Sequence, residues 1–203
     1  FAALEGGKVL YCREPEHGGE IEIMQQSAFK FELRPFAVPM PKGDGGTQKV
    51  ALATLWETSP DRRYYPSGFC LNPERDEPGK YNLWRGFGVE TAPGDWSLFQ
   101  AHILDVLADG NAEHADYINK WCAWSVQNPA EPPRVALVFK GAEGAGKGVF
   151  CSSLMEIFGE HGMRVQSMSH VTGKFNAHLR HLCLLFADEV HVVNEEQGGA
   201  LKG

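Results

Sequence analysis

Residues 135–148 read VALVFKGAEGAGKG, an apolar run followed directly by a glycine-rich loop that ends in Lys147 and Gly148. The run at 135–139 has the length of a buried strand, and the loop is followed by a segment with the apolar content of a helix. Glycines at 141, 144 and 146 let the backbone curl so that its N–H groups can point inward at an anion. The order strand, glycine loop, helix is the context that a phosphate-binding loop needs.

Each part of this loop has a predicted role in holding the phosphates of ATP. The backbone amides are the main donors, and the helix expected at about 148–158 directs its positive dipole end at the same place. Lys147 supplies a point charge to the outer phosphates. The predicted nucleotide-binding residues are Gly141, Ala142, Glu143, Gly144, Ala145, Gly146, Lys147, Gly148 and Val149.

Gly148 departs from the usual pattern, in which a Ser or Thr directly after the lysine offers its hydroxyl to Mg²⁺. Ser152 and Ser153 lie at least one helical turn further on and cannot replace that hydroxyl in the same geometry. Either a water fills the coordination position or the binding of the metal is weakened.

A second apolar run, at 182–187, ends in Asp188 and Glu189. Such a run predicts a parallel strand covered on both faces, and open α/β sheets place ligands at the C-terminal ends of these strands. Asp188 is the predicted ligand of Mg²⁺. Glu189 is the predicted catalytic base, which orients and deprotonates the water that attacks the γ-phosphate. Together the two runs predict a P-loop NTPase core in which Lys147 and Glu189 are catalytic.

The rest of the chain divides by pattern into two regions. Residues 1–92 predict a small α+β accessory region, with strands at 8–11 and 20–24 and a short helix at 50–57. Residues 93–133 have helical period and form a helical segment and linker, closed by two prolines. Residues 134–203 are the first half of an α/β core with a parallel sheet, with another strand at 164–168 and a helical connection at 174–180.

Periodicity also predicts which side chains are buried. The first helix, with Asp95 as its N-cap, should bury one apolar face, and the second should bury a broad aromatic stripe. The aromatic and arginine-rich stretches at 62–65 and 81–87 could stack on bases, but core packing is the favoured role. His178 and His181 have no further ligands nearby and are expected at the surface. The predicted buried helical residues are Phe99, Ile103, Val106, Leu107, Tyr117, Ile118, Trp121, Cys122, Trp124 and Ser125.

Composition limits the partners. A net charge of -7 argues against a surface that binds nucleic acid throughout, so any DNA contact should be local or built from several subunits. The 5 cysteines occur singly, as expected for thiols of a reducing compartment. Neither a transmembrane run nor a signal peptide is visible, which predicts a cytoplasmic protein without a membrane partner.

Five stretches together resemble one family. They are YNLWRGFG at 81–88, PGDW at 93–96, GAEGAGKG at 141–148, FNAHLR at 175–180 and FADE at 186–189. From about residue 60 to the end, the chain is similar to the helicase-like domain of phage and prophage primase-polymerases. That family is of the superfamily 3 type and is distantly related to the poxvirus primase-helicase.

The resemblance implies an AAA+-like ATPase that forms a homo-oligomeric ring on single-stranded or forked DNA, behind an upstream primase-polymerase module. It implies a phage or prophage protein that works with ATP and Mg²⁺ in a bacterial host cell. A glycine after the lysine resembles a variant seen among its members. Residues 201–203 resemble the opening of the next family motif, so we expect a fragment that lacks its sensor residue, arginine finger and DNA-gripping loop and hydrolyses ATP poorly alone.

Two other interpretations remain open at the level of sequence. A small-molecule or nucleotide kinase shares the phosphate loop, although it seldom needs a glutamate directly after the strand-end aspartate and usually has Ser or Thr at position 148. A non-catalytic module that binds nucleotide to stabilise an assembly is compatible with Gly148. Turnover of ATP by the intact protein, and its loss in Glu189→Gln, would distinguish the motor from both.

Overall fold

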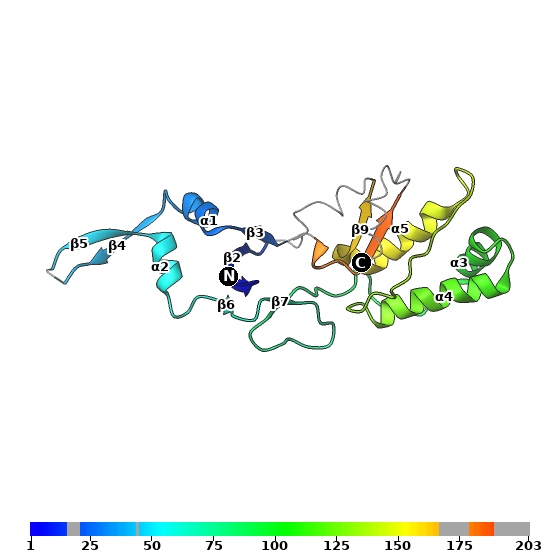
Figure 1. The fold of residues 1–203 in the computed structure, drawn as a ribbon, viewed down its shortest axis with the longest axis horizontal. Helices are drawn as coiled ribbons and strands as arrows, with labels where there is room; N and C mark the ends of the chain where they lie inside the picture. Colours follow the sequence, from blue (N-terminus) through cyan, green and yellow to red (C-terminus); the bar gives the residue numbers. More distant parts are fainter. Residues whose placement is uncertain (16–20, 44, 167–178, 189–203) are drawn as a thin grey trace. The chain divides into compact units, whose positions relative to one another are not determined.

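The computed structural model describes residues 1–15, 21–43, 45–166 and 179–188 (Figure 1). It shows a mixed α/β fold with several small sheets in two compact units, unit 1 at Phe1–Leu83 and unit 2 at Trp84–Gly203. The helical segment expected at 93–133 therefore belongs to the same unit as the glycine loop. Among the helices of the described residues, none has both the length and the apolar character needed to cross a membrane.

Unit 1 contains a four-stranded sheet with the order β3-β2-β1-β6. Its first three strands pair antiparallel, whereas β6 runs parallel to β1. Gly6 and Gly7 both have positive φ and form the two-residue turn between β1 and β2, a conformation that glycine favours in hairpins. The strand predicted at 8–11 is confirmed. The sheet comprises β1 Ala2–Glu5, β2 Lys8–Arg13, β3 Glu22–Met24 and β6 Tyr64–Tyr65.

The other elements of unit 1 are small. Two strands form an antiparallel hairpin, two form a short parallel pair, and the helix predicted at 50–57 is present. These elements are α1 Gln26–Glu32, β4 Ala37–Pro41, β5 Thr47–Ala51, α2 Leu52–Thr58, β7 Phe69–Cys70 and β8 Tyr81–Asn82.

Aromatic rings fill the core of unit 1. The ring of Tyr81 stacks on that of Phe1 with centroids 4.0 Å apart, and Tyr65 meets both rings edge-on. Core packing is therefore confirmed for Tyr81 and Leu83, which are buried, but Tyr64 is exposed. Arg63, which could have faced a base, instead pairs with Glu14 at 2.5 Å.

Unit 2 begins with helices whose packing differs from the predicted faces. In α3 (Ser97–Ala101) and η1 (His102–Leu107), Phe99, Ile103 and Leu107 contribute to the core as predicted. Val106 is exposed, contrary to prediction. The reason is that η1 is π-helical, with Ala108 N–H bonded to the Ile103 carbonyl, and the wider turn rotates Val106 off the face that a 3.6-residue period assigns to it.

The stripe predicted on α4 (Ala112–Gln127) is only half buried. Ile118 and Ser125 are buried, whereas Tyr117 and Trp124 are exposed. The helix therefore covers its neighbours with a narrower face than its aromatic content suggests.

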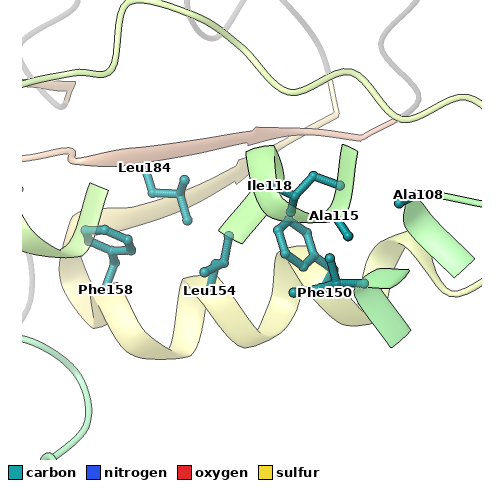
Figure 2. Close-up of a cluster of buried hydrophobic side chains, with 8 residues drawn as sticks. Ala108, Ala115, Ile118, Phe150, Leu154, Phe158 and Leu184 are labelled. Carbon is teal, nitrogen blue, oxygen red and sulfur yellow. The ribbon is translucent and has the colours of Figure 1, made fainter. Parts of the chain in front are cut away.

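The helix that follows the glycine loop supplies much of the hydrophobic core of unit 2. α5 (Lys147–Phe158) packs on β9 (Gly162–Val165) and β10 (Leu184–Ala187), which run parallel (Figure 1). Phe150, Leu154 and Phe158 line one side of α5 and form a cluster with Leu184 and with α4 (Figure 2). β9 begins earlier than the strand predicted at 164–168, and β10 lies within the run predicted at 182–187.

The segment at 135–139 is not a strand, contrary to prediction. No strand among the described residues pairs with it, and a strand exists only through a ladder with a neighbour. Its side chains still alternate, because Leu137 and Phe139 pack against the core while Val138 is 87% exposed. Likewise β10 is covered on one face rather than two, since Leu185 is 37% exposed.

Two close contacts fix the far end of α5. Gly88 donates its N–H to the Ile157 carbonyl at 2.8 Å, and a Cβ on Gly159, which has positive φ, would lie 2.8 Å from the Gly88 Cα. His161 is fully buried and accepts the Arg85 N–H on Nε2, so Nδ1 carries the proton and donates to the His181 carbonyl. Half-buried His181 thus takes part in the fold through its backbone.

Candidate phosphate-binding site

The glycine loop wraps around the start of a helix. Gly144 and Gly146 have φ of +75° and +92°, a region that side-chain-bearing residues rarely adopt. Gly146 is the N-cap of α5, which begins at Lys147. The first amides of a helix have no partner four residues back, and in α5 the Val149 N–H donates instead to the Gly146 carbonyl at 3.1 Å. Residues 141–145 are exposed and accessible to a ligand.

The Lys147 ammonium lies against the opposite limb of the loop. Its Nζ donates to the carbonyls of Gly141, at 3.0 Å, and Ala142, at 2.7 Å. The positive charge is therefore held across the glycine loop, and a cation in such a loop attracts phosphate oxygens. Gly148 and Val149 follow in the first turn of α5, and both are exposed.

Asp188 follows β10 and extends the pairing with β9, because its N–H donates to the Val165 carbonyl at 3.0 Å. Its carboxylate forms an ion pair through Oδ2 with Arg164 of β9. The Arg164 guanidinium also lies 5.4 Å from the centroid of the Phe186 ring. Glu189, the predicted catalytic base, lies outside the described residues, as do 175–178 and 201–203.

Cys151 is a partly buried thiol on α5, the helix that begins at the glycine loop. It lies four residues after Lys147, on the same side of α5. Burial raises the pKa of its thiol to about 11, and the negative charge of Asp188 contributes to the increase. The strand that Asp188 follows, β10, packs against α5.

The side chains available to a metal ion are few. In the described part of the chain, no cluster of three His, Cys, Asp or Glu residues could enclose one. Ser153 bonds back to the Val149 carbonyl at 3.0 Å and offers no hydroxyl to the loop. Mg²⁺ in nucleotide sites often uses only one or two carboxylates, with phosphate oxygens and waters, and Asp188 is the carboxylate that follows β10, paired with Arg164.

Two residues near the site were missed by reasoning from the sequence. Arg164 is recognisable only once the parallel register sets it opposite Phe186. His102 belongs to the helical segment, and its Nε2 lies 3.1 Å from the Gly146 carbonyl. Neither contact leaves a local signal, because both join residues that are distant in sequence.

Two solved structures of the NrS-1 C-terminal region, both in the apo form, resemble this chain. One is 19% identical with a TM-score of 0.59, over 96% of this chain and 44% of that chain. The other, an A form, is 20% identical with a TM-score of 0.60, over 99% of this chain and 46% of that chain. At this identity the likeness concerns the fold, and the chain spans less than half the length of either structure.

The comparison of folds reaches further along the chain than the motifs do, because it also includes residues before 60. A profile of a family of unknown function, DUF5906, matches residues 139–203, which contain the glycine loop and the two acids. A search of curated proteins finds no significant match.

Proposed function

We propose that the chain is the ATP-binding part of a helicase-type motor that acts on DNA, as in phage-like primase-helicases. The observation that carries the proposal is the glycine loop, which wraps around the start of α5 and holds Lys147 against its opposite limb. The packing of β10, which Asp188 follows, against the same helix and the motif resemblance over 60–203 support it.

In this proposal, the segment 141–149 binds the phosphates of ATP through its backbone amides other than that of Val149, which donates to the Gly146 carbonyl. Lys147 places its charge on the outermost two phosphates. Asp188 would hold Mg²⁺, which neutralises charge on the phosphates when it is bound. Glu189 would accept the proton of the attacking water as the γ-phosphate departs. Single-stranded or forked DNA, a homo-oligomeric ring and an upstream primase-polymerase module are the proposed partners.

The alternative is a P-loop protein that binds nucleotide without helicase activity, either a structural module or a small-molecule kinase. Gly148 and the ion pair of Asp188 with Arg164 favour the structural module, because both reduce the oxygen ligands available to a metal. It predicts nucleotide binding without appreciable hydrolysis.

Two measurements test the proposal. Equilibrium binding of a fluorescent ATP analogue to the chain should be lost in Lys147→Ala, and unchanged affinity would contradict the proposed site. In the intact protein, Glu189→Gln should retain binding and lose at least about 100-fold in ATP turnover, because general base catalysis contributes about that much. Binding without DNA-stimulated turnover in the intact wild type would favour the structural module.

A further inference from the structure

We propose that His102 is a positioning residue for the phosphate loop, and this inference rests on the proposed function. His102 is the first residue of η1, and its half-buried imidazole lies 3.1 Å through Nε2 from the Gly146 carbonyl oxygen. A carbonyl can only accept a hydrogen bond, so Nε2 carries the proton and donates it.

The imidazole also lies directly against the Gly146 Cα. A Cβ placed on Gly146 would be 2.6 Å from His102 Cε1, 3.4 Å from Nε2 and 3.6 Å from Nδ1. The ring thus fills the space that a side chain at position 146 would occupy. His102 and the left-handed φ of Gly146 exclude other residues from this position for separate reasons.

The hydrogen bond matters because of what the Gly146 carbonyl controls. This carbonyl shares one planar peptide with the N–H of Lys147, so the two groups point in opposite directions. It also accepts the Val149 N–H at 3.1 Å, which aligns it with the helix axis. By holding the carbonyl, His102 directs the Lys147 amide toward the concave side of the loop, where we place the phosphates.

The core of unit 2 holds His102 in place. Phe99, one turn before it, stacks on Phe150 of α5 with centroids 5.8 Å apart and planes at 14°. Ile103, the next residue, is 1% exposed within the same cluster. Core contacts of Phe99 and Ile103 therefore fix the backbone that carries the imidazole. The helix at this point is π-helical, a feature frequent at functional sites.

The test compares three variants of the 203-residue chain by their Kd for a fluorescent ATP analogue and by thermal unfolding. His102→Phe keeps a planar ring without a donor and should raise Kd by roughly three- to tenfold, the worth of one net hydrogen bond. His102→Gln restores an N–H near the Nε2 position and should recover most of the affinity. His114→Phe replaces an exposed histidine of α4 and is the matched control.

The outcomes separate the inference from the proposed function. Wild-type affinity in a folded His102→Phe, or equal losses in the Phe and Gln variants, would overturn the role of His102 even if Lys147→Ala abolishes binding. Failure of the wild type to bind the analogue would overturn the proposed function and this inference with it. Should His102→Phe not fold, His102→Gln decides, because wild-type affinity supports the donor role and a tenfold loss contradicts it.

Discussion

The two units use their hydrophobic cores differently. In unit 1 the core combines aromatic rings centred on Phe1 and Tyr81 with smaller apolar side chains, while α1 buries no residue at all. In unit 2 the core runs along α5, the helix that begins at the glycine loop. Packing and the candidate chemistry thus share one element in unit 2, so a change in that core should reach the loop. The same kind of change in unit 1 should affect stability alone.

The largest effect is expected from Phe150→Ala. Phe150 is 1% exposed and contacts the rings of Phe99 and Phe139, so its removal leaves a cavity behind the first turn of α5. We expect a loss of about 3–5 kcal/mol in the free energy of unfolding of unit 2, and weaker binding of ATP. Urea unfolding followed by circular dichroism measures the first. Phe31→Ala, at a side chain that is 70% exposed on α1, should change stability by less than about 0.5 kcal/mol; equal effects would break the contrast.

Tyr81→Phe tests the other side of the comparison. The Tyr81 hydroxyl donates to Glu14 Oε1 at 2.6 Å, a hydrogen bond to a charged acceptor that is partly buried. Its loss should lower the stability of unit 1 by about 1–2 kcal/mol and leave the affinity for ATP unchanged. Hydrogen exchange of the β1 and β2 amides reports the first quantity and calorimetric titration the second. A drop in ATP affinity would show that the unit 1 core also supports the loop.

Acid should weaken unit 2 before unit 1. Burial holds the pKa of His161 below its ordinary value of 6.5, so below about pH 6.5 the unfolded chain takes up a proton that folded unit 2 does not. The stability of unit 2 should therefore fall as pH drops through that range, by at most about 1.4 kcal/mol per pH unit from this group.

In unit 1 the relevant group titrates lower. Hydrogen bonds from Arg63 and then Tyr81 lower the pKa of Glu14 from 4.5, so its contribution is present above about pH 4.5 and is lost as the pH falls further. Amide hydrogen exchange at pH 7, 5.5 and 4 separates the units. His161→Gln should remove part of the slope of unit 2 between pH 6.5 and 5. Loss of protection in unit 1 first would contradict the assignment.

The smallest effect is expected from Arg164→Gln. The ion pair with Asp188 is partly exposed, with Arg164 at 48%, so removing it should change stability by no more than about 1 kcal/mol and less at high salt. Urea unfolding at two salt concentrations checks this. A loss comparable to that of Phe150→Ala would mean that the end of β10 carries stability as well as candidate chemistry.

Some elements of unit 2 could be predicted from the sequence, and others could not. The start of α5 was predictable because three glycines and Lys147 fall within one seven-residue stretch, and β10 because its apolar run is continuous. The exposure of Val106 could not be foreseen, since a π-turn has no simple sequence signature. The apolar run at 135–139 has the sequence pattern of a strand. Whether it becomes one depends on a neighbouring strand to pair with, and the run itself does not reveal that neighbour.

The candidate site divides in the same way. The loop residues and Asp188 are recognisable from composition and order alone. How β10 packs against α5 is not readable from the sequence, and the contacts of Arg164 and His102 depend on register and on a helical turn that periodicity does not encode. Local chemistry could thus be predicted, whereas the groups that position it could not.

The central claim is that the curled backbone ahead of α5 receives the phosphates of a nucleotide. An amide NMR titration of the isotopically labelled chain with ATP tests this most directly, because it reports on each backbone N–H separately. We predict the largest shifts at Gly144, Gly146, Lys147 and Gly148, saturating with ATP and absent in Lys147→Ala. Saturable shifts confined to unit 1, or no shift at these four amides, would contradict the account.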